Sequence, residues 1–127
     1  THQQSQISKS SEAVVQAQLD AYNARDLDAW LDTYSEEAEQ FLLHSGELAK
    51  GRDAIRARMV DRFKDEKLHA HLHHRIAMEH IVVDHEVVTR SSADGLETVE
   101  MICVYEVRGG KILKASFAFG QTRSVLA

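Results

Sequence analysis

The stretch Thr98–Gly120, TVEMICVYEVRGGKILKASFAFG, predicts two long β-strands joined by a tight turn. In both strands, larger and mostly apolar side chains alternate with a second set of residues that includes the charged ones. This alternation indicates a sheet with two unlike faces. Gly109 and Gly110 suit the positive φ angles that a short hairpin turn requires. One face carries the larger apolar side chains and needs a cover of helices. The interior that such a curved sheet encloses either fills itself or holds a ligand.

The rest of the chain supplies the cover and the remaining strands. Apolar residues at helical spacing predict three amphipathic helices. Period-two alternation predicts three more strands. The order of these elements predicts an α+β fold with a mostly antiparallel sheet. The helices are expected over residues 11–22, 26–34 and 52–64, and the other strands over 38–44, 68–79 and 81–90. Asp26 is expected to cap the second helix, and Ser45 and Gly46 to end the strand over 38–44. On the third helix, we expect a solvated face that carries Arg56, Arg58, Asp61 and Arg62.

Composition excludes several classes of partner. The net charge of −5 and the pI near 5.9 argue against a nucleic-acid-binding surface. No apolar run approaches the roughly 20 residues of a membrane span, so we expect no membrane partner. Cys103 is the single cysteine and suits a reducing compartment, so we expect a cytoplasmic protein. We expect a flexible N-terminal tail over residues 1–11 and one domain over residues 12–127.

Eight histidines are many for a chain of this length, and three of them are candidates for acid–base chemistry. Strand alternation places Gln40, Leu42 and His44 on one face, where His44 could act as a general base. Alternatively, His44 lies half in solvent at the end of its strand. His74 and His85 have apolar neighbours on their strand faces and could meet inside the fold. Alternatively, they are core histidines with a single backbone hydrogen bond each.

His69, His71 and His73 alternate along another strand face and have the spacing of possible metal ligands. Neither a cysteine pair nor an HExxH sequence accompanies them, and Arg75 continues the same face. We therefore expect a polar outer face or a dimer surface, and no metal. A histidine-rich dimer surface would make association pH-sensitive, a hypothesis that an unchanged oligomeric state from pH 5 to 8 would exclude.

Longer stretches of the chain resemble a known family. These are Val14–Phe41 (VVQAQLDAYNARDLDAWLDTYSEEAEQF), Gly51–Met59 (GRDAIRARM), Val104–Ile112 (VYEVRGGKI) and Phe117–Gly120 (FAFG). Together they resemble the SnoaL-like and ketosteroid-isomerase-like branch of the nuclear transport factor 2-like superfamily, over about residues 12–121. The resemblance implies a cone-shaped α+β barrel, a curved sheet wrapped by three helices around a pocket. It also implies a homodimer formed through the sheet.

The catalytic residues of the steroid isomerases are absent at the matching positions. Those enzymes use a carboxylate base on the first strand, with a tyrosine and a protonated aspartic acid as the oxyanion hole. Leu42 stands at the base position, Gln18 at the tyrosine position and Cys103 at the aspartic acid position. We therefore do not expect ketosteroid isomerisation by that mechanism.

The resemblance and the histidines together suggest a cofactor-independent isomerase, cyclase or dehydratase that acts on a carbonyl-bearing apolar molecule. A histidine would serve as the base and an amide as the hydrogen-bond donor. The alternatives are a non-catalytic ligand-binding or homo-association domain, and a filled pocket beside a partner-binding sheet face. The candidate catalytic residues are His44, Gln18, Gln40, His74 and His85. The candidate ligand-binding residues, which could also be plain core, are Trp30, Tyr34, Leu42, Met59, Phe63, Met101, Cys103, Phe117 and Phe119.

Overall fold

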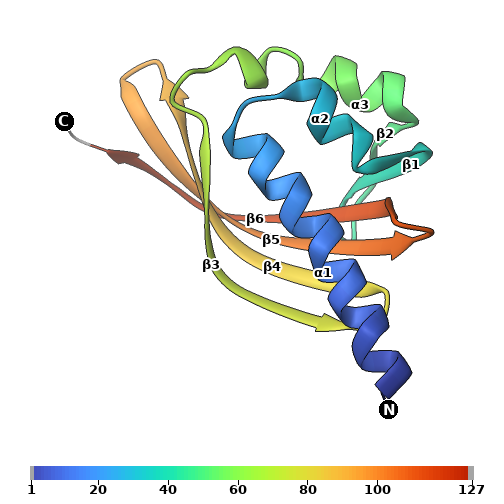
Figure 1. The fold of residues 1–127 in the computed structure, drawn as a ribbon. Coiled ribbons are helices and arrows are strands. Elements are labelled where there is room, and N and C mark those ends of the chain that lie inside the picture. Colours follow the sequence, from blue (N-terminus) through green and yellow to red (C-terminus); the bar gives the residue numbers. More distant parts are fainter. Residues whose placement is uncertain (1, 126–127) are drawn as a thin grey trace.

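The structure is a computed structural model that describes residues 2–125, with side chains from residue 6 onward. Within this range, three α-helices and one short 3-10 helix lie on the inner side of one strongly curved sheet (Figure 1). The helices are α1 (His2–Asn23), α2 (Leu27–Asp32), α3 (Arg52–Met59) and the 3-10 helix η1 (Arg62–Lys64). The strands are β1 (Tyr34–Leu42), β2 (Glu47–Lys50), β3 (His69–Met78), β4 (Ile81–Ser92), β5 (Gly95–Arg108) and β6 (Lys111–Val125).

The sheet is mixed but mostly antiparallel, with the strand order β2-β1-β6-β5-β4-β3. Only the pairing of β1 with β6 is parallel among these strands, and it closes the sheet beside the long β5–β6 hairpin. The predicted α+β class, with helices covering a curved and mostly antiparallel sheet, is confirmed. β2 was not predicted, because Ser45 and Gly46 were expected only to end the preceding strand.

The hairpin turn forms as its two glycines predict. Arg108 pairs with Lys111, which leaves Gly109 and Gly110 as a two-residue loop. Their φ angles are 58° and 79°, a region that favours glycine because it has no Cβ. The inner side of the hairpin is buried, and Tyr105 and Phe117 contact each other edge-to-face there.

The helix ends differ from the predicted ones in several places. α1 begins at His2, so Ser11 lies inside the helix, where its hydroxyl donates a 2.8 Å hydrogen bond to the Glu79 carbonyl. The flexibility expected for residues 1–11 stays a prediction, and Thr1 lies outside the described residues. Asp26 caps α2 as expected, accepting a hydrogen bond from the Ala29 amide. Helix α3 ends at Met59, several residues before the predicted end, and η1 follows it.

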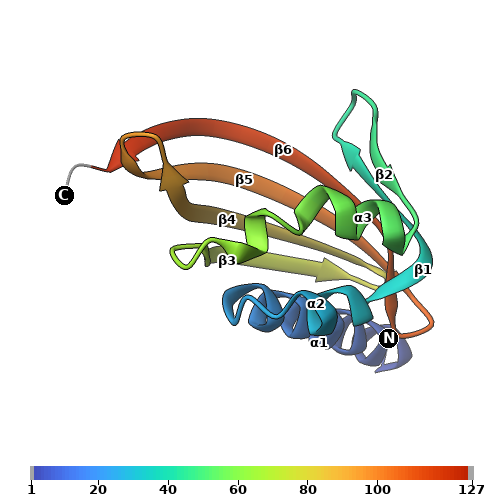
Figure 2. The same ribbon diagram turned by 90° about the horizontal axis from the view of Figure 1, so that it is seen from above.

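The helices cover one face of the sheet and leave the other face bare. α1 packs across β3 and β4, whereas α3 packs on β1 and β2. Figure 2, seen from above, shows β3–β6 as one curved layer with the described helices on its inner side. None of the described helices is long and apolar enough to span a membrane. The side chains between helices and sheet form the core, which includes Val15, Leu19, Trp30, Leu31, Ile55, Leu68, Val82 and Ile112.

Candidate functional site

A cavity of about 220 Å³ lies inside the curve of the sheet. One side of its wall comes from α1, α2, the end of α3 and η1, and the other from the inner faces of β1, β4, β5 and β6. The lining is mixed, because a carboxyl group and three guanidinium groups stand among aromatic and sulfur-containing side chains. The larger apolar side chains that the sequence predicted on one sheet face therefore make up only part of this wall.

Many of the predicted ligand-binding residues line this cavity. Trp30 and Tyr34 approach each other at 4.9 Å between ring centroids, where α2 meets β1. Their roles toward a ligand stay predictions. The predicted site residues in the wall are Gln18, Trp30, Tyr34, Gln40, Met59, Met101, Cys103, Phe117 and Phe119.

Three other predicted residues lie elsewhere. Phe63 is buried behind the wall, 5.3 Å from the Tyr22 ring and 5.1 Å from the Trp30 ring, so it supports the cavity from outside. Leu42 is half-buried at the end of β1, beyond the lining. His44 is exposed in the turn after β1, with a φ of 60°. The expected shared face with Gln40 is therefore wrong for His44, because β1 ends before strand alternation reaches it.

The inward orientation expected for His74 and His85 is also wrong. β3 carries a bulge between Leu72 and His74, so the residues after it change face. His74 pairs with His85, and both side chains lie on the outer face of the sheet, where His85 contacts Glu100 at 2.7 Å. The same bulge turns Arg75 inward, although alternation predicted it on the outer face.

The outer face gathers imidazoles but forms no recognisable metal site. The rings of His71 and His73 lie 4.9 Å apart, and those of His73 and His85 lie 5.3 Å apart. Among the described residues, no three His, Cys, Asp or Glu side chains are arranged to hold a metal ion.

The most unusual group in the cavity is the carboxyl of Glu86, which the sequence analysis did not single out. Glu86 points inward from β4 and is only 5% exposed. Its Oε2 atom has no hydrogen-bond partner within the described part of the chain. Burial raises the pKa of Glu86 to about 7, and the neighbouring negative charge of Asp84 adds to this effect. Glu86 can therefore exchange a proton near neutral pH.

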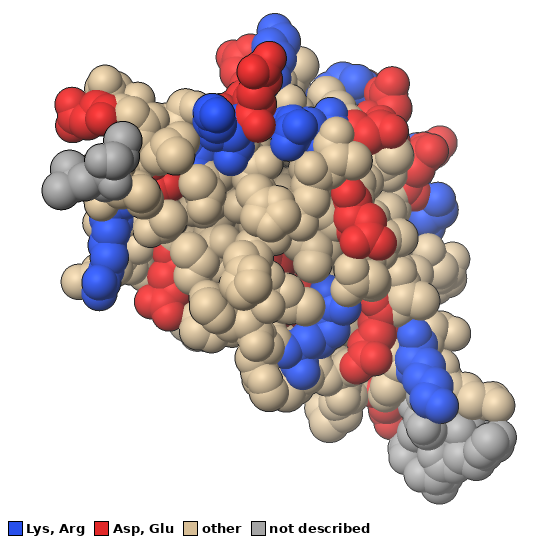
Figure 3. All heavy atoms as spheres, turned by 60° about the vertical axis from the view of Figure 1, so that its left-hand side comes forward, with Lys and Arg blue, Asp and Glu red and all other residues tan. Residues whose placement is uncertain are grey.

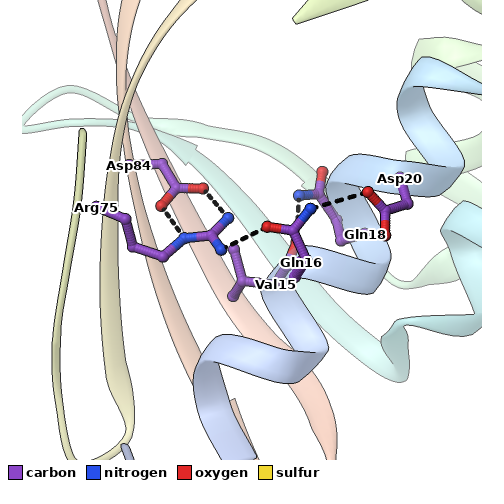
Figure 4. A network of polar contacts seen from close by, with 6 residues as sticks. All are labelled: Val15, Gln16, Gln18, Asp20, Arg75 and Asp84. Atoms are coloured by element: carbon purple, nitrogen blue, oxygen red, sulfur yellow. Dashed lines mark hydrogen bonds and ion pairs between the residues drawn. The ribbon is translucent and has the colours of Figure 1, made fainter. Parts of the chain in front are cut away.

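Asp84 takes the cation that would otherwise neutralise Glu86. The guanidinium of Arg75 binds both carboxylate oxygens of Asp84, at 2.6 and 2.8 Å. Figure 4 shows that this ion pair continues into α1, where Arg75 donates to Gln16 and Gln16 donates to Asp20. The two acidic side chains thus share one strand face, and the cation beside them, Arg75, is bound to Asp84. Burial first, and the charge of Asp84 second, therefore keep the pKa of Glu86 raised.

Hydrogen-bond donors face the same cavity from β1 and α3. Arg58 donates to the Gln40 Oε1 atom at 2.8 Å, so the Gln40 amide nitrogen faces Tyr34 and donates to its hydroxyl oxygen at 3.4 Å. The Tyr34 proton is therefore directed away from Gln40 and remains able to donate to a ligand. Burial raises the pKa of Tyr34, so this hydroxyl stays neutral.

Gln18 has a structural task in the wall. Its Oε1 atom accepts a 2.9 Å hydrogen bond from the Trp30 indole, and its Nε2 atom donates to the Val15 carbonyl at 3.3 Å. Figure 4 shows Gln18 on α1, one turn along from Val15. These contacts orient the Trp30 ring in the wall. A donor role of Gln18 toward a ligand stays a prediction.

The pattern that points to Glu86 is present in the sequence but weak. Asp84 and Glu86 share one face of β4 with Val82 and Val88. Both valines are buried, and acidic side chains are unusual on a buried strand face. Periodicity alone does not say which face of β4 is inside. Arg58 was assigned to a solvated helix face, because the short length of α3 and its position over the cavity are not visible in the helical pattern.

The comparisons with known proteins agree with this fold. The family model described as a SnoaL-like domain matches residues 15–115. No curated protein matches the chain significantly.

Several solved structures are similar. A cystatin-fold protein from Novosphingobium aromaticivorans is 21% identical with a TM-score of 0.76, covering 84% of this chain and 96% of its own. SalBIII, described as an epoxide hydrolase/cyclase-like enzyme in pyran ring formation in the polyether salinomycin, is 17% identical with a TM-score of 0.79, covering 88% and 92%. An LEH-like epoxide hydrolase from M. tuberculosis is 16% identical with a TM-score of 0.73, covering 89% and 84%.

At these sequence identities, similarity to the solved structures establishes only the fold. The family model matches most of the chain, and the elements that it spans build the cavity described above. The chain belongs to the SnoaL-like family, within the nuclear transport factor 2-like superfamily.

Proposed function

We propose that this chain is a cofactor-independent acid–base enzyme of the isomerase or cyclase kind, acting on a small molecule with a carbonyl group, and that Glu86 is its general base. The observation that carries the proposal is a buried carboxyl with a free oxygen in a cavity and a pKa of about 7. Enzymes raise carboxyl pKa values in this way so that one group can accept and return a proton at neutral pH.

The chemistry follows from the groups around the cavity. Glu86 Oε2 would take a proton from the carbon next to the carbonyl, and the electron pair of that C–H bond would move to the carbonyl oxygen. The Tyr34 hydroxyl is a donor that can stabilise the resulting oxyanion. Glu86 would then return the proton to another carbon of the same molecule, which completes an isomerisation without a cofactor.

A proton-exchange experiment tests the base without knowledge of the natural substrate. We expect the protein to accelerate exchange of the acidic C–H protons of 2-tetralone in D2O, followed by NMR. Glu86→Gln should lower this rate by about 100-fold or more, the usual share of a general base. Glu100→Gln is the matched control, because Glu100 is an exposed acid on the outer face and pairs with His85 there. An equal rate in Glu86→Gln and the parent protein would contradict the assignment of the base.

The rival function is non-catalytic binding in the same cavity. It predicts that 2-tetralone quenches or shifts the fluorescence of Trp30, the single tryptophan, without any accelerated exchange. That result would favour a ligand-binding domain over an enzyme.

We also propose that the chain forms a homodimer through the outer face of β3–β6. Ile76 and Met78 are 58% and 72% exposed there, and Ile102 adds a third exposed large apolar side chain. Exposed apolar groups that adjoin on one sheet face favour association. The buried free thiol of Cys103 fits the reducing cytoplasm, where we propose that the protein acts.

A further inference from the structure

Two guanidinium groups at the α3–η1 side of the cavity have no acidic partner. Arg58 and Arg62 both line the cavity. Arg58 donates to Gln40 and to the Met59 sulfur, and its guanidinium carbon lies 5.8 Å from the centroid of the Phe117 ring. Among the described residues, no carboxylate lies within ion-pair distance of either arginine.

The acids nearest to this side of the cavity are engaged by other groups. Asp61 pairs with Lys64 at 3.5 Å. Asp65 lies within electrostatic reach of Arg62, but its carboxylate accepts hydrogen bonds from the Ser91 amide and hydroxyl, both at 2.7 Å.

The third cavity arginine differs from these two, because it carries its own counterion. Arg90 pairs with Glu97 at 2.5 Å, and both side chains are mostly buried. Arg58 and Arg62 are therefore the uncompensated cations of the cavity wall among the described residues.

These two arginines also stand where the cavity approaches the surface. They line a second hollow of about 520 Å³ together with Asp61, Lys64, Asp65 and Ser91. Figure 3 brings this side of the molecule forward, and it shows basic and acidic side chains along the upper edge above a broad uncharged surface. The two guanidinium groups therefore border both the outer hollow and the cavity with its aromatic wall.

Two like charges close together favour an anion between them. Arg58 and Arg62 line the same two hollows, which places the two groups near each other. Burial lowers the pKa of Arg58, and the positive charge of Arg62 also lowers it. A planar guanidinium presents paired N–H donors that match a carboxylate. With Glu86 ionised, one substrate carboxylate would bring the four groups to a net charge of zero.

We infer that the substrate of this cavity is a carboxylic acid with an apolar body, whose carboxylate binds Arg58 and Arg62 while its reactive end faces Glu86. This inference rests on the proposed function of the cavity, but its test does not depend on turnover. Trp30, Met101 and Phe117 would contact the apolar body.

A pair of unreactive probes separates charge recognition from catalysis. We propose titrating the protein with 4-phenylbutyrate and with its neutral amide, 4-phenylbutyramide, and following Trp30 fluorescence at low ionic strength. We expect the acid to bind about ten-fold more tightly than the amide or better. Rising salt should reduce that preference, because it screens the charges.

Variants assign the preference to the two arginines. Arg58→Gln and Arg62→Gln should each lower the acid-to-amide ratio, and the double variant should bring it close to one while amide binding persists. Arg56→Gln is the matched control, because Arg56 lies on the same helix but pairs with the exposed Asp28. Circular dichroism of each variant checks the fold.

The outcomes distinguish the inference from the proposed function. Equal affinity for acid and amide in the parent protein, binding of neither probe at millimolar concentration, or an equal loss of preference in Arg56→Gln would overturn the inference. Glu86→Gln should keep or increase the preference for the acid, because it removes a negative charge from the cavity. A preserved preference together with no proton exchange would support the anion site and contradict the enzyme.

Discussion

Glu86 shows how a single residue acquires unusual chemistry from its neighbours. Its side chain is buried on the same strand face as Asp84, and the neighbouring cation, Arg75, is bound to Asp84 through both oxygens. Ionising Glu86 therefore creates a second negative charge where little water reaches it. This charge destabilises the folded state but not the unfolded chain, where water surrounds Glu86. The effect can therefore be measured as a free energy of unfolding that depends on pH.

We expect the protein to lose stability as the pH rises through neutrality because of Glu86. The folded-state pKa is about 7, above the ordinary value of 4.5, so the folded protein holds the proton more tightly than the unfolded chain. The favourable contribution is complete below about pH 4.5 and is lost as the pH rises through 7, with a total of about 3 kcal/mol. Urea unfolding at pH 5 and pH 8.5 measures it. Glu86→Gln should lack most of this difference, and an unchanged pH profile in that variant would refute the account.

Arg75 is expected to be the most costly arginine to remove. Arg75→Leu would leave the fully buried Asp84 carboxylate without its counterion, at a cost of about 3–5 kcal/mol in the free energy of unfolding. The double variant Arg75→Leu/Asp84→Asn should recover a large part of this loss. Arg56→Leu is the comparison, because its exposed pair with Asp28 is worth no more than about 1 kcal/mol. Equal losses in the two single variants, by denaturant unfolding, would contradict the argument.

At the scale of elements, a bulge in β3 decides which side chains reach the interior. Leu72 pairs with Glu86 and His74 pairs with His85, so one extra residue, His73, lies between the two pairs. Every β3 residue after it changes face relative to simple alternation. This brings Arg75 to Asp84 and sends His74 to the outer face.

Deletion of His73 should therefore be tolerated better than deletion of a paired strand residue. Without His73 the ladder becomes regular and Arg75 still faces Asp84, so the protein should keep one cooperative thermal transition. Val83 pairs with Ile76 on one side and Val104 on the other. Its deletion should turn inward-facing residues of β4 to the outer face and abolish that transition. Calorimetry of both variants checks the comparison, and a greater loss on deleting His73 would show that the bulge itself is needed for folding.

At the scale of the whole molecule, all described helices lie on one side of the sheet. The opposite side carries a row that runs from Ile76 through Val83 to Val104, neighbours in register across three strands. A group of histidines lies beside this row, around His85. These features place an apolar surface and titratable groups on the same bare face.

We expect this bare face to be the dimer interface, and Ile76→Lys to make the protein monomeric in sedimentation velocity at pH 8. A charged side chain in the centre of an apolar contact lacks a partner there. Leu48→Lys is the control, because Leu48 is an exposed apolar residue on β2, far along the sheet from β3. A dimer that persists in Ile76→Lys would exclude this face.

Much of the fold could be predicted from local patterns. The alternation in β5 and β6, the Gly109–Gly110 turn and the Asp26 cap are short-range features, and each forms as expected. The site was predicted less completely. Gln40 was found from strand alternation and Trp30 from the apolar stripe of its helix, and both line the cavity. Glu86 and Arg58 were missed, because their importance depends on burial and on neighbours distant in the sequence.

The amino-acid sequence by itself determined the class of fold, the long hairpin and the helices that cover it, because periodicity and turn chemistry act over a few residues. Only the tertiary structure decided which face of β4 is inside and which residue carries the chemistry. A one-residue bulge in β3 reverses the assignment of a whole strand face. The unusual pKa of Glu86 then arises from contacts among β3, β4 and α1, which no local pattern encodes.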